Sequence, residues 1–164
     1  MSRLLQPVQT AAALTDSVIV GFSGGKDSVV TLDLCARYFQ RVEVYFLYYV
    51  PGLSFQERTL SWAERHYGLT IYRLPHFELS QMLQYGSFRP VDLKSPTIEV
   101  ADLYAHLRAR FDLHWIAGGE RIADSIWRRA MLKKSGTIDR KRGRIYPVAH
   151  FTKANIMAYL KLHR

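Results

Sequence analysis

The sequence contains GFSGGKDS at residues 21–28, and much of its organisation can be worked out from this stretch. It overlaps the end of Ser17–Phe22, a short β-branched run that predicts a buried strand, and leads into Asp27–Gln40, whose apolar residues recur at helical spacing. Asp27 can cap that helix. A glycine-rich turn between a strand and a helix brings backbone N–H groups close to an anion, at the positive end of the helix. The stretch therefore predicts a phosphate-binding loop.

The loop offers an anion flexible glycines, hydroxyl groups and one full positive charge, from Gly24, Gly25, Ser23, Ser28 and Lys26. The pattern is not a Walker loop, because Val20 and Asp27 stand where that motif needs glycine and Ser or Thr. It is not the dinucleotide fingerprint either, because Ser23 occupies the place of the second glycine.

Strands and helices alternate along the rest of the chain. Apolar runs predict further strands over 42–50, 69–74 and 113–117, and amphipathic stretches predict helices over 54–67, 77–84, 97–111, 121–134 and 152–163, with loops over 85–95 and 135–144. Strands that are apolar on both faces and alternate with helices indicate a parallel sheet covered on both sides. We therefore expect a single α/β domain over residues 1–164, with about five strands sandwiched by helices and a ligand at the carboxyl ends of the strands.

The net charge of +9 is concentrated in the last part of the chain. Residues 1–120 hold 11 Lys and Arg against 12 Asp and Glu, whereas residues 121–164 hold 12 against 2. This asymmetry indicates nucleic acid, nucleotide phosphate or an anionic membrane as a partner, or else a solvated basic surface. We expect Lys133–Arg144 to contact nucleic acid through its phosphates, because this stretch has no aromatic side chain for base stacking.

Cys35 is the only cysteine, and its place on an apolar helix face predicts a core residue. One cysteine excludes an internal disulfide, a Cys-based structural zinc site and an iron–sulfur cluster built from this chain's thiolates. No apolar run is long enough to span a membrane, and the first residues make a poor secretory signal. We expect a cytoplasmic protein.

Four segments carry a resemblance to a known family. SGGKDS at 23–28 resembles the PP-loop of the ATP pyrophosphatases, the adenine-nucleotide α-hydrolase-like group. GGERIADSIWRR at 118–129 is similar to the Gly-x-Arg-x-x-(Glu/Asp)-Ser-x-x-Arg segment of the phosphoadenosine phosphosulfate (PAPS) reductase family. The segment 50–58, VPGLSFQER, shares Gly, Phe and Glu with that family but lacks its Asp and both of its Thr residues. The segment 147–159, PVAHFTKANIMAY, is similar to a family segment, and we expect it to be structural, a capped helix that packs on the sheet.

The resemblance implies a Rossmann-like, HUP-type fold and an adenine nucleotide, ATP or PAPS or its precursor APS, with Mg²⁺ at Asp27. It implies nucleotide contacts from Phe22, Ser23, Gly24, Gly25, Lys26, Asp27, Ser28, Tyr49, Gly52, Gly118, Gly119, Arg121 and Ser125. The implied catalytic residues are Lys26, Asp27, Arg121 and Arg128. Arg121 and Arg128 are seven residues apart, so on one helix they would share a face and converge on phosphate oxygens.

The resemblance also limits the reaction. Reductases of the family attack sulfur with a cysteine in a C-terminal motif, and this chain has no cysteine after Cys35. The implied reaction is attack on the α-phosphorus of ATP, which gives an adenylylated acceptor and pyrophosphate. Two alternatives remain: a PAPS- or APS-binding protein whose thiol comes from a partner protein, and a non-catalytic module that binds nucleic acid.

Overall fold

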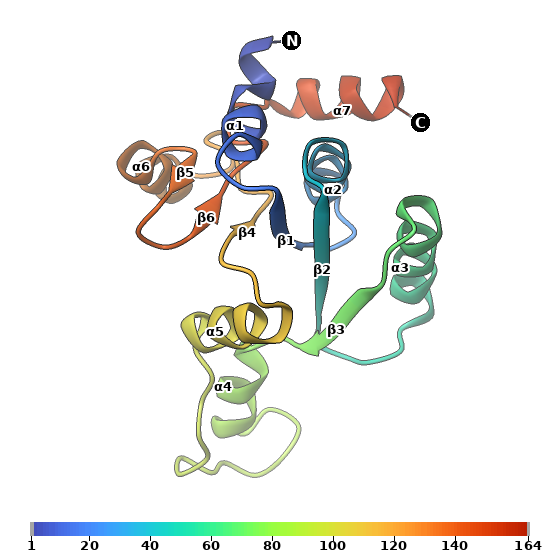
Figure 1. Ribbon diagram of the computed structural model, residues 1–164. Coiled ribbons are helices and arrows are strands. Elements are labelled where there is room, and N and C mark those ends of the chain that lie inside the picture. The colour runs from blue at the N-terminus through green and yellow to red at the C-terminus, as the bar shows by residue number, and fades with distance from the viewer. Residues whose placement is uncertain (1, 164) are drawn as a thin grey trace.

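The structure is a computed structural model that describes residues 2–163. Within these residues, a six-stranded sheet has the order β3-β2-β1-β4-β6-β5 (Figure 1). The strands are β1 (Ser17–Gly21), β2 (Arg41–Tyr48), β3 (Ile71–Pro75), β4 (Ile116–Ala117), β5 (Ile138–Asp139) and β6 (Arg144–Ile145). Neighbours are parallel, except that β5 and β6 are antiparallel. The strand order reverses between β1 and β4, where ligands of such sheets bind.

Helices cover both faces of the sheet, as the α/β class predicts. They are α1 (Ser2–Ala12), α2 (Lys26–Tyr38), α3 (Ser54–Tyr67), α4 (Glu78–Gln84), α5 (Val100–Phe111), α6 (Ile126–Ser135) and α7 (Lys153–Leu162). Buried side chains of α1, α2, α3 and α7 form the main core on one face. On the other face, Leu103 and Leu107 of α5 pack against Ile19 of β1. The expected fold class is confirmed.

Three parts of the expected element assignment are wrong. The sheet has six strands, because the predicted loop 135–144 folds into the short hairpin of β5 and β6. The predicted helix 121–134 begins only at Ile126, because the Ser125 hydroxyl accepts the Arg128 N–H at 3.1 Å and caps the helix there. The helix α1 was not expected; its Pro7 lies in the second turn, where it removes only one backbone hydrogen bond.

Asp33, in the middle of α2, ties three helices together. Its carboxylate accepts hydrogen bonds from Tyr159 Oη of α7 at 2.7 Å, from Arg37 Nε at 2.7 Å and from Tyr67 Oη of α3 at 3.3 Å. Burial alone would raise the pKa of Asp33, but the hydrogen bonds from Arg37, Tyr159 and Tyr67 outweigh it and lower the pKa. This contact holds α2, and with it the phosphate-binding loop, in a fixed position.

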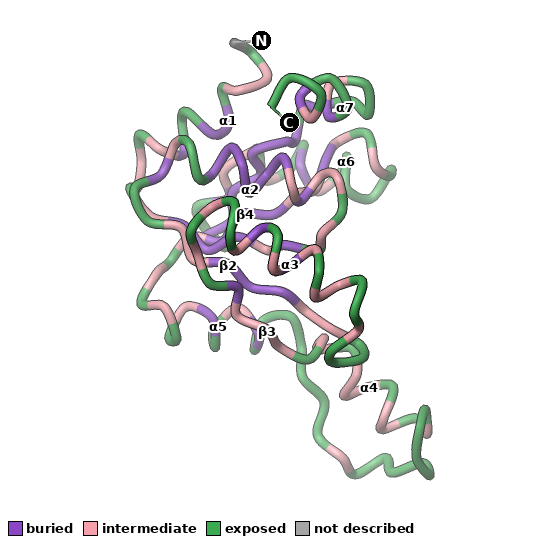
Figure 2. Tube along the Cα trace, turned by 90° about the vertical axis from the view of Figure 1, so that its right-hand side faces the viewer, coloured by how far each residue is buried: buried purple, intermediate pink, exposed green. Residues whose placement is uncertain are grey.

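The segment between β3 and α5, which contains α4, extends away from the body of the protein (Figure 2). Most of its residues are exposed, in contrast to the buried strands. No helix within residues 2–163 is long and apolar enough to cross a membrane.

Candidate functional site

The loop after β1 is shaped by glycine and held by serine hydroxyl groups. Gly24 has a φ of +74°, which side chains other than glycine rarely adopt. The buried Ser28 hydroxyl donates to the Gly25 carbonyl at 2.8 Å, and the Ser23 N–H donates to Ser28 Oγ at 3.2 Å. Gly25 is the N-cap of α2, so Asp27 is not the cap but the second helical residue. The first N–H groups of α2 have no partner within the helix and are available to an anion.

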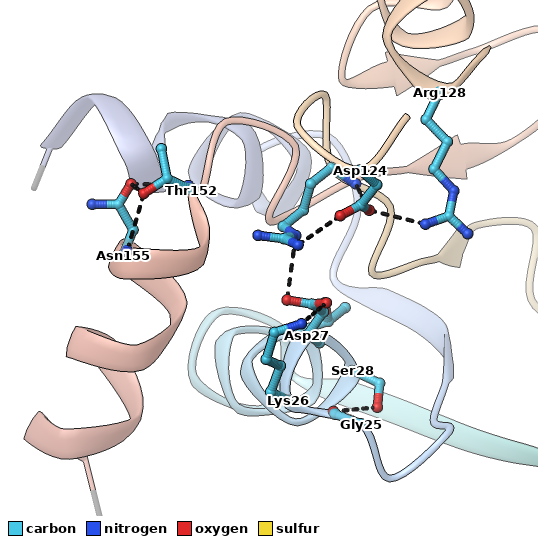
Figure 3. A network of polar contacts seen from close by, with 10 residues as sticks. Gly25, Lys26, Asp27, Ser28, Asp124, Arg128, Thr152 and Asn155 are labelled. Carbon is cyan, nitrogen blue, oxygen red and sulfur yellow. Dashed lines mark hydrogen bonds and ion pairs between the residues drawn. The ribbon is translucent and has the colours of Figure 1, made fainter. Parts of the chain in front are cut away.

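A chain of alternating charges runs from the loop to the start of α6 (Figure 3). Lys26 Nζ lies 2.7 Å from Asp27, and Asp27 lies 3.3 Å from Arg121 Nε. The Arg121 guanidinium also donates a hydrogen bond to the Asp124 carboxylate at 2.6 Å, and the Arg128 guanidinium donates one to the same carboxylate at 2.9 Å. Arg121 therefore lies in the turn before α6, not on a shared helix face with Arg128. The two guanidinium groups nevertheless converge, because both bind Asp124.

Asp124 is held as a carboxylate in this chain of charges. Burial alone would raise its pKa, but the Arg121 N–H and the guanidinium groups of Arg121 and Arg128 outweigh burial and lower it. Asp124 therefore stays ionised and positions both arginines.

A second charged cluster lies beside the first, and no pattern in the sequence predicts it. Arg144, at the start of β6, is only 6% exposed. Its guanidinium donates to Glu120 at 3.0 Å and to the Tyr104 hydroxyl, and it lies over the rings of Tyr104 and Tyr146 at 4.6 and 5.4 Å. Burial raises the pKa of Glu120. The sequence separates Arg144 from Tyr104 by 40 residues, so no local pattern pairs them.

Gly118 and Gly119 allow these groups to approach the loop. A Cβ atom on Gly118 would overlap the Glu120 carboxylate and lie 2.6 Å from Arg144 Nη2. A Cβ atom on Gly119 would lie 3.4 Å from the backbone of Asp27 and of Ser28. Gly118 therefore leaves room for the contact between Glu120 and Arg144, and Gly119 lets the end of β4 pack closely against the start of α2.

The loop and both clusters enclose a cavity of about 280 Å³ at the carboxyl ends of β1 and β4. Its lining comprises Gly21, Ser23, Asp27, Ser28, Tyr45, Tyr104, Gly118, Gly119, Glu120, Arg128 and Arg144. A larger cavity of about 660 Å³ lies along α2 and reaches Gly24 and Lys26, with mostly aromatic side chains from α3 and α7. We place the reactive site in the smaller one, because it lies at the reversal of strand order and collects the charged groups.

Among residues 2–163, every buried side-chain oxygen or nitrogen that lacks a hydrogen-bond partner belongs to these two clusters. These atoms are Asp27 Oδ1, Glu120 Oε2, Arg121 Nε, Arg121 Nη1 and Arg144 Nε. Buried polar groups are ordinarily satisfied, and leaving one unsatisfied costs about 1–3 kcal/mol. Three of the five are guanidinium nitrogens, and such donors suit an anionic ligand.

The remaining predicted residues do not line this cavity. Gly24 and Lys26 line the larger one, and six others are in neither lining: Phe22, Gly25, Tyr49, Gly52, Arg121 and Ser125. Phe22 is buried in the main core, so only its backbone can reach a ligand. Tyr49 stacks on His76 at 4.4 Å, and its hydroxyl donates to Glu78 at 2.6 Å. Gly52 follows β2 with a φ of +72°, and Ser125 caps α6. Their contacts with a nucleotide stay predictions.

The predicted Mg²⁺ contact of Asp27 also stays a prediction. Its two oxygens already face Lys26 and Arg121, and residues 2–163 contain no group of three or more His, Cys, Asp or Glu side chains that could hold a metal ion. Cys35 is fully buried, as expected, and burial raises the pKa of its thiol.

Comparison with known proteins now adds to this geometry. The family model described as the phosphoadenosine phosphosulfate reductase domain matches residues 17–164. An uncharacterized protein of Methanocaldococcus jannaschii is 45% identical over 60 residues, which is 35% of this chain and 12% of that protein. The chain thus spans a small part of that relative's length.

Solved structures share the fold at low sequence identity. The PAPS reductase of Candida auris, in a phosphate complex, is 14% identical with a TM-score of 0.63 over 98% of this chain and 79% of its own. The FMN adenylyltransferase of Candida glabrata, in complex with ATP, is 17% identical with a TM-score of 0.59, over 97% of this chain and 55% of its own. The U34-tRNA thiolase of Methanococcus maripaludis is 15% identical with a TM-score of 0.60 over 99% and 62%.

The thiolase corrects one expectation. Its structure is described with a [4Fe-4S] cluster, so the exclusion of an iron–sulfur cluster is wrong for a chain of this fold. The exclusion counted only this chain's own cysteines. Such a count says nothing about ligands that another segment or another chain supplies.

Proposed function

This chain belongs to the phosphoadenosine phosphosulfate reductase domain family, and on that premise we propose that it binds ATP and transfers the adenylyl group to an acceptor with release of pyrophosphate. The chain is an adenine-nucleotide-binding domain of the PP-loop type. The observation that carries the proposal is the gathering of all unpartnered buried polar atoms of residues 2–163 around the loop. Arg121 Nε and Asp27 Oδ1 among them face each other in an ion pair at 3.3 Å, so a triphosphate supplies acceptors for the other two guanidinium nitrogens, Arg121 Nη1 and Arg144 Nε.

The charges of the site support phosphate binding. Lys26, Arg121, Arg128 and Arg144 bring four positive charges, against three carboxylates from Asp27, Glu120 and Asp124. The N-terminus of α2 adds its partial positive charge at the loop. The half-exposed Arg128 has room to turn from Asp124 toward a phosphate, whereas the buried Arg121 is already fixed.

Each group then has a role in the reaction. The N–H groups at the start of α2 and Lys26 hold the β- and γ-phosphates, which leave as pyrophosphate. Arg121 and Arg128 neutralise the charge that develops around the α-phosphorus. The acceptor forms a bond to the α-phosphorus, the bond to the bridging oxygen breaks, pyrophosphate takes the electron pair and the acceptor releases its proton to water. Positioning and charge neutralisation of this kind account for much of catalysis in phosphate chemistry.

A second candidate is suggested by the family itself. A PAPS- or APS-binding protein would need a thiol to reduce the sulfonucleotide. The buried Cys35 cannot supply it, so the thiol would come from a partner protein. Contact of Lys133–Arg144 with nucleic acid, a single domain over residues 1–164 and a cytoplasmic location also remain proposals.

Titration calorimetry with ATP, a non-hydrolysable ATP analogue and PAPS, each with and without Mg²⁺, tests the proposal. We expect ATP to bind and Lys26→Ala to weaken it by about 10- to 150-fold, the loss of one hydrogen bond to a charged group. Lys94→Ala is the matched control, because this exposed lysine lies in the segment that extends from the body. Binding of PAPS without ATP would favour the second candidate. Equal affinity of the two lysine variants would refute the assigned site.

A further inference from the structure

The helix α6 presents a solvent face that combines large apolar side chains with cations. Trp127 is 86% exposed and Ile126 is 83% exposed, and no other large hydrophobic side chain in residues 2–163 is more exposed than Trp127. At 100° per residue, Lys134 projects within about 20° of Trp127 and Lys133 within about 20° of Ile126, whereas Arg129 projects about 160° from Trp127. All three cations are exposed. A large indole ring left in water beside a cation is unusual for a surface that binds nothing.

The opposite side of α6 fixes this orientation. Leu132 is buried against Tyr146 and Ala149, and Met131 packs on the same cluster. The helix therefore cannot rotate to bury Trp127 without exposing its own core. The exposed face is a property of the folded domain.

This face carries no negative charge. The two acidic residues of 121–164 are Asp124 and Asp139, whose side chains are only 13% and 10% exposed and lie in ion pairs. The turn between β5 and β6 adds Arg140, Lys141 and Arg142, all exposed. In Figure 1, α6 lies beside β5 and β6. The two elements together contribute exposed cations and the exposed indole ring of Trp127.

The surface adjoins the cavity through Arg128. This residue is on the first turn of α6, directly after Trp127, and lines the cavity at Gly118 and Gly119. Trp127 is therefore one residue from a side chain that lines the proposed reactive site.

We propose that α6 and the β5–β6 turn bind single-stranded nucleic acid, with a base stacked on Trp127 and phosphates on the surrounding cations, and that this strand carries the acceptor. The role as acceptor rests on the proposed adenylyl transfer, whereas the binding does not. The proposal extends the expectation for Lys133–Arg144, which foresaw phosphate contacts alone: Trp127, outside that stretch, supplies the missing stacking surface.

The chemistry of the surface favours a single strand. A base must leave its stack to lie on an indole ring, which a single strand permits at little cost. An interfacial membrane helix needs a broad apolar face, and here Ile126 and Trp127 are the only large apolar side chains exposed on α6.

Fluorescence anisotropy with labelled single-stranded RNA and DNA 20-mers, and with the corresponding duplexes, tests the binding in the absence of ATP. We expect Trp127→Ala to weaken single-strand binding by about 5- to 140-fold, the effect of one stacked base. Trp62→Ala, which removes a half-exposed tryptophan from α3, is the matched control and should bind as the unmodified protein does. Preference for the RNA or the DNA strand identifies the nucleic acid.

The salt dependence tests the cations separately. Replacing Arg129, Lys133 and Lys134 by Gln should reduce the slope of log affinity against log salt by about 2, because each phosphate contact on a single strand contributes about 0.7. Equal binding of Trp127→Ala and the unmodified protein, or binding to phosphatidylserine vesicles but to no oligonucleotide, would overturn the proposal.

The two proposals fail in different ways. Lys26→Ala should lose ATP and keep the oligonucleotide, and Trp127→Ala should do the reverse. Oligonucleotide binding without ATP binding or pyrophosphate release would refute adenylyl transfer and leave the binding surface intact. If the protein binds no oligonucleotide but still releases pyrophosphate undiminished with a small-molecule acceptor, the proposed nucleic-acid-binding surface is refuted and adenylyl transfer stands.

Discussion

Replacement of Gly118 by Ala tests the contact between Glu120 and Arg144 without straining the backbone. The φ of Gly118 is outside the left-handed region, so alanine can adopt it. The added methyl group would overlap the Glu120 carboxylate and lie 2.6 Å from Arg144 Nη2. Glu120 can turn away, but it then gives up its 3.0 Å hydrogen bond to Arg144.

The magnitude is that of one buried hydrogen bond between charged groups. Arg144 keeps the Tyr104 hydroxyl and its aromatic neighbours, so the loss stays below the 3–5 kcal/mol or so of a fully broken buried ion pair. We expect Gly118→Ala to lower the free energy of unfolding by about 1.5–3 kcal/mol. For a chain of this length, this corresponds to a fall in Tm of about 3–12 °C.

Urea denaturation of a double-mutant cycle measures the effect. The cost of Gly118→Ala should be smaller in Glu120→Ala than in the unmodified protein, because the methyl group then meets only Arg144 Nη2 and no carboxylate. Additive costs of the two substitutions would show that the methyl group acts elsewhere, and would refute the assigned contact.

Two further outcomes are expected from the buried ionisable groups. The pKa of Asp124 is lowered in the folded protein, so its ion pairs contribute fully to stability above the ordinary aspartate pKa of 3.8 and are lost as the pH falls through the lowered value. The difference in the free energy of unfolding between the unmodified protein and Asp124→Asn, measured by urea titration, should therefore shrink from about pH 6 to pH 3. A difference that stays constant over this range would contradict the prediction. The Cys35 thiol should not react with a thiol reagent in the native protein and should react once in urea, because it is fully buried; rapid native labelling would contradict its place in the core.

The loop could be predicted from the sequence because its determinants are local. Gly24, Gly25 and Ser28 lie within five residues, and the strand and helix on either side have clear apolar patterns. The fold does not show whether the predicted residues contact a nucleotide, so these contacts stay predictions. The fold class could be predicted for the same reason, since it depends on the alternation of strands and helices.

The rest of the site depends on contacts across the chain. Arg144 meets Tyr104 and Glu120 only because β6 lies beside β4 and α5 packs on the same edge of the sheet. No residue spacing in the sequence predicts these contacts. The predicted start of α6 was wrong for a different, local reason: the Arg121 N–H binds the Asp124 side chain, which forms a turn before the helix.

The hydrogen bond from Tyr159 to Asp33 also bears on the order of folding. It joins residues 126 positions apart, and closing a chain segment of that length costs about 4 kcal/mol of entropy. Contacts of such high sequence separation form late, after local helices and neighbouring strands. During synthesis, α2 therefore gains its last support only when α7 has emerged. The glycine-rich loop at the head of α2 therefore reaches its final position at the end of folding, although it lies near the beginning of the chain.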